Sequence, residues 1–452
     1  MGKIYLETFG CQMNALDSHL ILSKMQAQGY TTTEAKDEAD VILFNTCSVR
    51  EHAEEKALSH AGMVRKLKTA RPELVVGVVG CMAQNRQDAL FKQLPHVQLI
   101  VGPRHFGAIP RLVEEIRASG QRRIAVADFD DEFIDGAEAV QTRTTQAQAY
   151  VKAMEGCDLS CAFCIVPTTR GAEVSRPPER IVEECRRLAA QGTVEVTLLG
   201  QTVNSYGKGL KPYCDLGGLL RKLSEIDGLR RLRFITSHPS FVRPSLIEAM
   251  RDLPKVCKYL HFPAQSGSNR ILKAMRRGYT VERYLEIVDS LRAQVPGIEL
   301  ASDWIVGFPG ETAEDFDATL ALMERVRFQN SFIFQYSPRP GTDAAALADD
   351  VSEPEKARRN QALLALQERI SREKNLARVG QTLEVLVEGP SKKNAERMTG
   401  RSDTHQLVHF EAGRDLTGRF VDVEISAATS LSLTGRLPAL SESSCGGRVE
   451  GT

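Results

Sequence analysis

The sequence predicts an α/β protein in three parts: an N-terminal parallel α/β sandwich, a central partial (β/α)6 barrel and a small C-terminal β-barrel. Up to residue 378, short apolar runs of strand length alternate with amphipathic stretches of helix length, which is typical of parallel α/β folds. Beyond that residue, short alternating strands are separated by turn residues. The length of 452 residues also suits about three domains.

The composition is that of an ordinary globular protein, with 42% hydrophobic and 26% charged residues. Lys plus Arg and Asp plus Glu both number 58, which argues against a histone-like protein but leaves room for a local RNA-binding face. No signal peptide precedes the first strand and no apolar run reaches about 18 residues, so we expect a cytoplasmic protein with no membrane partner. Cysteines in such a chain are metal ligands or core residues rather than disulfides.

The first part, residues 1–120, contains three strand–helix units in which each strand leads to a cysteine: Cys11, Cys47 and Cys81. The carboxyl ends of parallel strands meet at one edge of a sheet, so we expect these cysteines to converge as ligands of a metal cluster. The alternative is three buried core cysteines, since free Cys packs as a small hydrophobe. Strands are expected at 3–9, 41–45, 75–79 and 97–101, and helices at 14–28, 48–68, 83–93 and 105–118.

Residues 121–148 are charged and then rich in Thr, Gln and Ala, and we expect them to form a linker. The strand–helix alternation then resumes in the central part, residues 149–378, where six strands with intervening helices suit a partial barrel. The strands are expected at 151–154, 194–199, 232–235, 259–262, 299–306 and 332–336. The helices are expected at 179–191, 217–226, 244–251, 269–275, 281–294, 313–326 and 353–378.

Three further cysteines, Cys157, Cys161 and Cys164, follow the first strand of this barrel at CxxxCxxC spacing. With 10 cysteines in the chain, chance would produce such a triplet only ~0.005 times. Three thiolates with no fourth nearby favour a 4Fe–4S cluster with one open iron, because structural zinc takes four protein ligands. A zinc knuckle or a disulfide is the alternative.

The triplet, with Phe163 before its last cysteine, resembles that of the radical S-adenosylmethionine enzymes. The resemblance implies that the open iron binds S-adenosylmethionine and that an electron from the cluster cleaves it to a 5′-deoxyadenosyl radical, which abstracts hydrogen from a C–H bond. It also implies cofactor contacts at the later strand ends, and it assigns no catalytic residue beyond the clusters. The implied cofactor-binding residues are Phe163, Gln201, Asn204, Ser237, Gln265, Asp303, Gly307 and Glu311.

The segments around the N-terminal cysteines read TFGCQMN, NTCSVRE and GCMAQ, and they resemble the cluster-binding segments of the methylthiotransferases. This implies an auxiliary 4Fe–4S cluster at Cys11, Cys47 and Cys81 that delivers sulfur, and therefore two 4Fe–4S clusters in all. Nearly the whole chain is similar to the MiaB-type tRNA methylthiotransferases.

That resemblance implies methylthiolation of carbon 2 of isopentenyl-adenosine at position 37, next to the anticodon of tRNA. One S-adenosylmethionine would donate the methyl group and a second would be the radical source. An electron donor such as flavodoxin or ferredoxin and a monomeric enzyme are expected. The segment after the triplet, residues 170–176, departs from the family because two basic positions are Ala172 and Val174, so less RNA contact is expected there.

Two relatives share the reaction type and differ in substrate, one modifying threonylcarbamoyl-adenosine in tRNA and the other an aspartate of a ribosomal protein. The residues after Cys11 and the segment YSPRPG at 336–341 favour the isopentenyl-adenosine enzyme. An alternative of another class is a non-catalytic RNA-binding iron–sulfur protein, for instance a redox sensor. The intact triplet argues against it.

Residues 379–440 are expected to form a β-barrel with strands at 382–388, 405–410 and 418–425, followed by a flexible tail at 441–452. This barrel resembles the TRAM domain, which implies contact with the anticodon stem-loop of tRNA. Basic residues gather in the loop-rich segment after its first strand, where they could contact phosphates or form an ordinary solvated loop. These are Lys392, Lys393, Arg397 and Arg401. The cysteines that match no cluster motif are Cys185, Cys214, Cys257 and Cys445.

Overall fold

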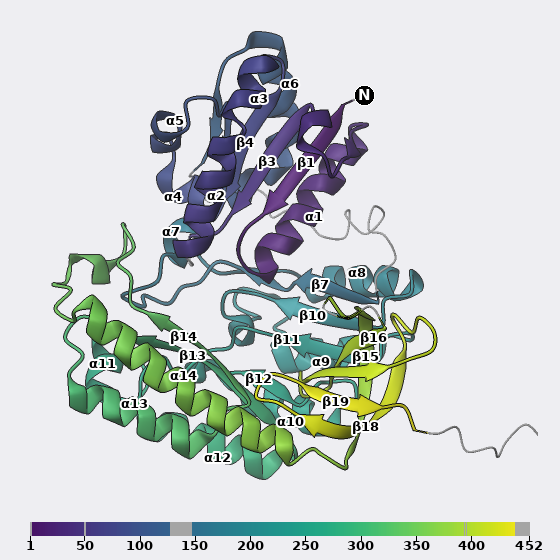
Figure 1. Ribbon diagram of the computed structural model, residues 1–452, viewed down its shortest axis with the longest axis vertical. Coiled ribbons are helices and arrows are strands. Elements are labelled where there is room, and N and C mark those ends of the chain that lie inside the picture. The colour runs from purple at the N-terminus through teal and green to yellow at the C-terminus, as the bar shows by residue number, and fades with distance from the viewer. Residues whose placement is uncertain (1, 49–50, 127–146, 393, 395, 439–452) are drawn as a thin grey trace, which may run out of the picture.

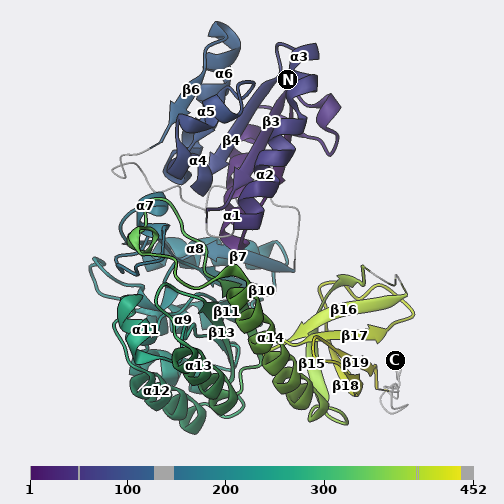
Figure 2. The same ribbon diagram turned by 60° about the vertical axis from the view of Figure 1, so that its left-hand side comes forward.

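The computed structural model describes residues 2–48, 51–126, 147–392, 394 and 396–438. It confirms the α/β class and the three predicted parts (Figure 1). The N-terminal sheet stands over one end of the central barrel, and the small β-barrel lies beside the central barrel (Figure 2). No helix of the described residues combines the length and the apolar character needed to cross a membrane.

The N-terminal domain is a six-stranded parallel sheet in the order β2-β1-β3-β4-β5-β6. Its two central strands are buried along their whole length, as expected where helices cover both faces of a parallel sheet. The strands are β1 (Lys3–Thr8), β2 (Thr31–Thr32), β3 (Val41–Thr46), β4 (Val75–Gly80), β5 (Leu99–Val101) and β6 (Arg123–Ala125). The helices are α1 (Gln12–Ala27), α2 (Glu51–Met63), α3 (Arg65–Ala70), α4 (Cys81–Arg86), α5 (Ala89–Gln93) and α6 (Ile109–Ser119).

Several details differ from the sequence prediction, which did not include strand β2. The helix expected at 48–68 is divided at Val64 into α2 and α3, and the helix expected at 83–93 is divided at Gln87, whose φ of +46° cannot continue a helix. The segment assigned to a linker also contains β6, which pairs with β5. Residues 127–146 of that segment lie outside the described residues.

The central domain consists of two parallel three-stranded sheets, β11-β10-β7 and β12-β13-β14. A bridge between Leu232 and Val256 joins them into one open barrel of six strands. The strands are β7 (Gln148–Lys152), β10 (Glu195–Leu199), β11 (Arg231–Phe234), β12 (Tyr259–His261), β13 (Glu299–Val306) and β14 (Asn330–Gln335). The helices are α8 (Pro178–Ala190), α9 (Leu216–Ser224), α10 (Pro244–Asp252), α11 (Asn269–Ala274), α12 (Val281–Gln294), α13 (Ala313–Val326) and α14 (Glu353–Leu376). Short elements near the triplet are β8 (Met154–Glu155), β9 (Val174–Ser175) and α7 (Val166–Arg170).

Side chains on these strands alternate between the helices outside and the inner face of the barrel. Val196, Leu198 and Phe234 join the main core against the helices. Part of the inner face of the first sheet is instead covered by helix α1 of the N-terminal domain. There Met13, Leu16 and Leu20 of α1 pack on Leu199, with Tyr150 and Ile235 beside them.

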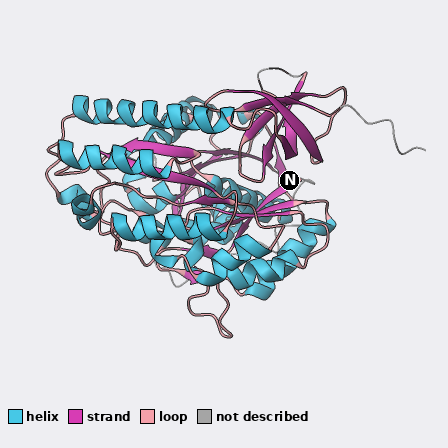
Figure 3. Cartoon of the chain, turned by 90° about the horizontal axis from the view of Figure 1, so that it is seen from below, coloured by secondary structure: helices cyan, strands magenta, loops and turns pink. Residues whose placement is uncertain are grey.

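The C-terminal domain is a closed five-stranded barrel in the order β15-β16-β17-β19-β18, next to the end of the long helix α14 (Figures 2 and 3). Two of its strands, β16 and β19, were not predicted, because each carries only one large apolar side chain. The prediction of a loop-rich segment around Arg397 and Arg401 was therefore wrong: both lie in β16. The strands are β15 (Thr382–Pro390), β16 (Arg397–Ser402), β17 (Leu407–Glu411), β18 (Phe420–Ala428) and β19 (Leu433–Arg436).

Two buried arginines at the start of β11, Arg231 and Arg233, attach this barrel to the central domain. Their guanidinium groups donate to backbone carbonyl oxygens, and Arg233 also forms an ion pair with the buried Glu195 at 2.9 Å. The acceptors are the carbonyl oxygens of Glu384, Arg401, Ser402 and Asp403, at 2.8, 2.8, 2.6 and 2.8 Å. Such charge-assisted bonds fix the small barrel against the core.

Candidate active site

The three N-terminal cysteines lie together at the carboxyl edge of the N-terminal sheet. Cys11 precedes α1, Cys47 follows β3, and Cys81 begins α4 directly after β4. A hydrogen bond with Cys47 lowers the pKa of the Cys11 thiol to about 6, with help from the charge of Arg170. Burial raises the pKa of Cys81, which also interacts with Cys11 and Arg170. The convergence of the three strand ends predicted from the sequence is therefore present.

Two buried asparagines hold the loops of Cys11 and Cys47 together. Asn14 Oδ1 accepts from the backbone N–H of Cys11 at 3.2 Å, and Asn14 Nδ2 donates to the carbonyl of Thr46, next to Cys47, at 3.1 Å. In return, Asn45 Nδ2 donates to the carbonyl of Asn14 at 2.8 Å. The loops that carry Cys11 and Cys47 are thus bonded to each other and not only to their own strands.

Two glycines allow the cysteine loops to approach this closely. Gly80 has a φ of +97°, and a Cβ there would lie 2.5 Å from Asn45 Oδ1 and 2.6 Å from the carbonyl oxygen of Thr46. Gly10 has a φ of +134°, and its Cβ would lie 2.6 Å from the Cβ of Cys47. Both positions require glycine for their backbone conformation and for the space.

The second cysteine group follows β8 at the carboxyl end of the barrel strands. The Cys157 thiol is buried and lies 3.2 Å from Thr202 Oγ1. The Cys161 sulfur accepts a hydrogen bond from Nη1 of the buried Arg277 at 3.2 Å. Burial raises the pKa of Cys164 to about 12. Hydroxyl and guanidinium donors on these sulfurs would stabilise thiolates that bind iron.

The donor chemistry of both groups fits an iron–sulfur cluster. Within the described residues, no three His, Cys, Asp or Glu side chains are close enough to hold one metal ion. A single zinc ion would need sulfurs about 3.8 Å apart, because each Zn–S bond is about 2.3 Å long. In a cubane each thiolate binds a different iron, so the sulfurs stand farther apart. Three thiols in each group leave one iron open to another ligand.

Besides Glu311, which follows β13, two residues predicted to contact S-adenosylmethionine carry buried polar atoms with no hydrogen-bond partner in the described part of the chain. They are Ser237 Oγ and Gln265 Oε1, each just after a barrel strand. Gln265 also has a φ of +66°, which is uncommon for a residue other than glycine. Buried polar atoms without partners are rare in native structures, and these two suit a polar ligand at the strand ends.

Three other predicted residues take part in the fold around the triplet. Gln201 Oε1 accepts from the backbone N–H of Gly156, next to Cys157, at 2.7 Å. The Asn204 side chain exchanges two hydrogen bonds with the backbone of His238, at 2.9 and 2.8 Å. Phe163 packs beside the apolar cluster that contains Phe308. These side chains position the triplet loop and the strand ends.

The remaining predicted residues belong to β13 and the turn that follows. Asp303 Oδ1 lies 2.9 Å from His261 Nε2 on the inner face of the barrel. Gly307 has a φ of +71°, and its N–H donates to Glu311 Oε2 at 2.6 Å. The same oxygen accepts from Arg359 Nη1 at 2.7 Å, while burial raises the pKa of Glu311. Glu311 therefore braces this turn with one oxygen and leaves Oε1 without a hydrogen-bond partner among the described residues.

Sequence reasoning missed a cluster of four buried charges between the two cysteine groups. Arg170, at the end of α7, donates to Asp17 Oδ2 at 2.6 Å and to Glu155 Oε1 at 2.9 Å. Lys152 Nζ lies 3.1 Å from Glu155 Oε2 and 3.4 Å from Asp17 Oδ1. None of the four side chains is more than 5% exposed. We call these residues the Asp17–Arg170 cluster.

The Asp17–Arg170 cluster joins the N-terminal and central domains beside both cysteine groups. Asp17 follows Cys11 by six residues, and Arg170 follows Cys164 by six residues (17 − 11 and 170 − 164). Arg104 of the N-terminal domain adds hydrogen bonds to the carbonyls of Arg170 and Ala172, at 3.1 and 3.0 Å. The sequence signal that could have indicated this cluster is a charged residue six positions after a cluster cysteine in each domain.

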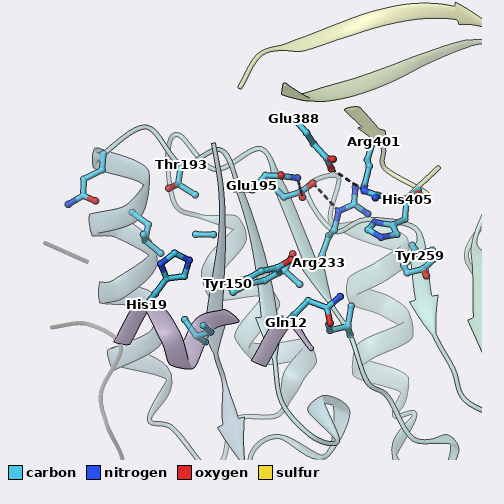
Figure 4. A pocket seen from close by; sticks show the side chains of 17 residues that line it. Gln12, His19, Tyr150, Thr193, Glu195, Arg233, Tyr259, Glu388, Arg401 and His405 are labelled. Carbon is cyan, nitrogen blue, oxygen red and sulfur yellow. Dashed lines mark hydrogen bonds and ion pairs between the residues drawn. The ribbon is translucent and has the colours of Figure 1, made fainter. Parts of the chain in front are cut away.

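A cavity of about 310 Å³ lies on the inner face of the barrel, where all three domains meet (Figure 4). Its lining combines aromatic, polar and aliphatic side chains and includes the first residues of β7, β10 and β12, so the cavity lies at the amino ends of these strands. An ion pair between Arg401 and Glu388, at 3.0 Å, crosses the C-terminal side of this cavity. The N-terminal domain contributes Gln12 and His19 to the lining, and the central domain contributes Tyr150, Arg233 and Tyr259. The C-terminal domain contributes Glu388, Arg401 and His405.

Of the four predicted RNA-binding residues, the structure describes three, and these three do not all line the cavity. Arg401 lines the cavity, whereas Arg397 lies 3.7 Å from Glu411 on the exposed side of the small barrel. Lys392 is exposed after β15, and Lys393 lies outside the described residues. The segment 170–176 offers no basic group to RNA either, because Arg170 and Arg176 are both buried in ion pairs.

Three of the four cysteines outside the cluster motifs lie within the described residues, and none of these three belongs to either cysteine group. Cys185 and Cys257 are buried, and Cys214 is half-buried. Cys445 and the predicted tail, 441–452, lie outside the described residues.

Comparison with known proteins assigns a family to each part of the chain. The Uncharacterized protein family UPF0004 matches residues 3–102, the Radical SAM superfamily matches 151–323, and the TRAM domain matches 376–437. The chain is 45% identical to the tRNA-2-methylthio-N(6)-dimethylallyladenosine synthase of Rhodopirellula baltica, over 98% of this chain and 97% of that protein. It is also 45% identical to the synthase of the same name from Moorella thermoacetica, over 95% and 97%.

Two solved structures share the fold at low sequence identity. The radical S-adenosylmethionine methyltransferase TsrM from Kitasatospora setae is similar with a TM-score of 0.57 and 15% identity, over 76% of this chain and 75% of that one. The cobalamin-dependent S-adenosylmethionine radical enzyme OxsB is similar with a TM-score of 0.52 and 12% identity, over 76% and 55%. These similarities concern the fold alone.

The substitution Gly80→Ala should remove iron from the N-terminal cysteine group. The added Cβ would collide with Asn45 and Thr46 and displace Cys81. We expect reconstituted protein to hold about half of the wild-type iron, since the triplet would keep its own 4Fe–4S cluster. The matched control is Gly120→Ala, where φ is also positive (+68°) but no atom lies within 4 Å. Full iron content in Gly80→Ala would contradict this account.

The substitution Arg170→Met should destabilise the apoprotein strongly. It leaves Asp17 and Glu155 buried with Lys152 as their one remaining partner in the cluster, and breaking a buried pair costs about 3–5 kcal/mol. The measurement is the midpoint of urea unfolding followed by circular dichroism. Arg436→Met, which removes an exposed ion pair with Glu424, should leave the midpoint unchanged. Equal midpoints for the two variants would show that the buried cluster is not stabilising.

Proposed function

The chain belongs to the family of tRNA-2-methylthio-N(6)-dimethylallyladenosine synthases, and we propose that it adds a methylthio group to carbon 2 of isopentenyl-adenosine at position 37 of tRNA. The observation that carries this proposal is the position of the two cysteine groups. Three thiols at the N-terminal strand ends and the radical S-adenosylmethionine triplet flank one buried charge cluster. A sulfur-donating centre and a radical-generating centre can therefore serve one bound base.

Six cysteines would hold the two clusters: Cys11, Cys47 and Cys81 the auxiliary one, and Cys157, Cys161 and Cys164 the radical one. When bound, the clusters and S-adenosylmethionine supply the sulfur, the methyl group and the radical. The chain contributes binding and orientation. Thr202 and Arg277 bond to the sulfurs of the triplet.

The unpartnered Ser237 Oγ and Gln265 Oε1 are suited to orient the cofactor at the strand ends. Met13, Leu16 and Leu20 of α1 form an apolar contact with the first barrel sheet. This contact excludes water from the side of the auxiliary site next to Cys11.

The partners implied by this proposal are tRNA, through its anticodon stem-loop, and S-adenosylmethionine. The matched TRAM domain supports a site for RNA. We further propose an electron donor such as flavodoxin or ferredoxin, a monomeric enzyme and a reaction in the cytoplasm, where tRNA is modified.

Two substrates of the same reaction type are the competing candidates: threonylcarbamoyl-adenosine in tRNA and an aspartate of a ribosomal protein. The names of the relatives, which match over nearly their full length, favour isopentenyl-adenosine. A non-catalytic RNA-binding iron–sulfur protein would have no use for unpartnered polar atoms at the ends of the barrel strands.

An anaerobic single-turnover assay on reconstituted protein tests the proposed substrate. Anticodon stem-loops with isopentenyl-adenosine and with threonylcarbamoyl-adenosine are offered in parallel, and the nucleosides are analysed by mass spectrometry. We expect a methylthio product on the first RNA alone. Product on the second RNA alone would support the proposed reaction type and contradict the proposed substrate. Cleavage of S-adenosylmethionine with neither RNA modified would direct attention to the ribosomal protein.

Cysteine variants should separate the two centres. Cys81→Ala is expected to abolish methylthiolation and to leave reductive cleavage of S-adenosylmethionine, whereas Cys157→Ala should abolish both. Cleavage is followed as 5′-deoxyadenosine by liquid chromatography. Cys214→Ala changes a half-buried cysteine outside both groups and should retain both activities. Loss of cleavage in Cys81→Ala would contradict the division of labour.

A further inference from the structure

Strand β14 carries an exposed aromatic surface that has no role in the reaction as proposed so far. Of the phenylalanines that the structure describes, only Phe332 and Phe334 are exposed, at 45% and 39%. They are two residues apart, so both rings point to the same face of the sheet. We call the pair the β14 aromatic strip.

The strip faces the inside of the barrel. Ile333, between the two rings, packs against the main core on the opposite face, where helix α14 lies across the strand (Figure 1). Its backbone carbonyl accepts from the Asn360 side chain of α14 at 3.2 Å. The register pairs Phe332 with Asp303 and Phe334 with Ile305 on β13, so each ring shares the inner face with its β13 neighbour.

The strip connects two parts of the candidate site. At one end, the ring of Phe332 makes an edge contact with His261 at 6.3 Å, and His261 pairs with Asp303. At the other end, Ile305 packs on the apolar cluster that contains Ala162, and Ala162 lies between Cys161 and Cys164. An apolar group resting on the strip would therefore lie beside the radical-generating triplet.

The two sheets of the central barrel differ in how much of their inner face is covered by other parts of the protein. Helix α1 packs on the carboxyl end of the first sheet, where Leu16 and Leu20 contact Leu199. On the second sheet, Phe332 and Phe334 stay uncovered although they face the same interior. Exposed aromatic surface inside a functional site is unfavourable for the free protein and typically marks a contact with a ligand.

We propose that the β14 aromatic strip binds the isopentenyl group of the substrate adenine and selects tRNA that already carries it, an inference that rests on the proposed function. The isopentenyl group is a branched apolar chain of five carbons, and its transfer from water to a ring surface is favourable. A threonylcarbamoyl group is polar and negatively charged, and it would lose water against the same rings without gaining a partner. Apolar rings therefore reject the competing substrate while they hold the correct one.

The test is equilibrium binding of anticodon stem-loop RNA to the reconstituted full chain, measured by fluorescence anisotropy under anaerobic conditions. One RNA carries isopentenyl-adenosine and its pair carries unmodified adenosine at the same position. We expect the wild type to prefer the first. The double variant Phe332→Ala/Phe334→Ala should lose about tenfold in affinity for the isopentenyl RNA and keep its affinity for the unmodified RNA. Unchanged binding of the unmodified RNA also reports that the variant is folded.

Two further variants complete the experiment. Phe334→Leu keeps an apolar side chain and should retain most of the preference. Leu431→Ala removes an apolar side chain that is 85% exposed on the C-terminal barrel and should change neither affinity.

A wild-type preference that persists in the double variant would overturn this inference and leave the proposed function intact. Equal losses on both RNAs would also overturn it, because the rings would then serve any base. A wild type without preference would count against both this inference and the proposed substrate.

Discussion

The arrangement of the site depends on four charges buried where the N-terminal and central domains meet. Buried charges are costly to remove from water unless their partners are correctly placed. In the Asp17–Arg170 cluster the partners come from four separate segments: α1, β7, β8 and α7. Desolvation alone would raise the pKa of the Glu155 carboxyl, but the positive charges of Lys152 and Arg170 lower it to about 2. Glu155 therefore stays ionised. Only the docked arrangement of both domains satisfies all four groups.

This requirement couples domain docking to the position of the cysteines. Asp17 lies on the helix that Cys11 precedes, and Arg170 ends the helix that follows Cys164. A shift of one domain against the other would separate these two charges before it changed the distance between the cysteine groups by much. Because buried ion pairs tolerate little displacement, the spacing of the two groups is held by electrostatics as well as by packing.

Helix α1 and the C-terminal barrel then divide the inner face of the central barrel. The apolar side of α1 packs on Leu199 at the end of the first sheet, and Arg231 and Arg233 of β11 hold the small barrel by bonds to its backbone. Arg231 also bonds to the side-chain carboxylate of Glu384 at 3.1 Å, so backbone and side-chain acceptors of the small barrel both take part in the attachment. Its own polar side chains, such as Arg401 and Glu388, are then free to line the cavity that all three domains share.

The sequence alone was enough to predict the chemistry of the cysteine groups and most of the fold. The spacing of Cys157, Cys161 and Cys164 is a local property of the chain, and so are the apolar periods that predicted β13, α12 and α13 with their observed bounds. The three-domain α/β architecture was confirmed for the same reason. Short strands with few apolar residues, such as β6 and β16, were missed because neighbouring strands, and not their own side chains, stabilise them.

Only the tertiary structure decided which residues meet. Arg170 bonds to Asp17 across 153 positions of sequence, and Arg233 bonds to Ser402 across 169, distances at which no periodic pattern carries information. The same holds for the exposure of Phe332 and Phe334. Their strand pattern predicts two faces, but whether the inner face is covered depends on where α1 docks. Local spacing determines which groups a segment can offer, and long-range packing determines which of them remain open to a ligand.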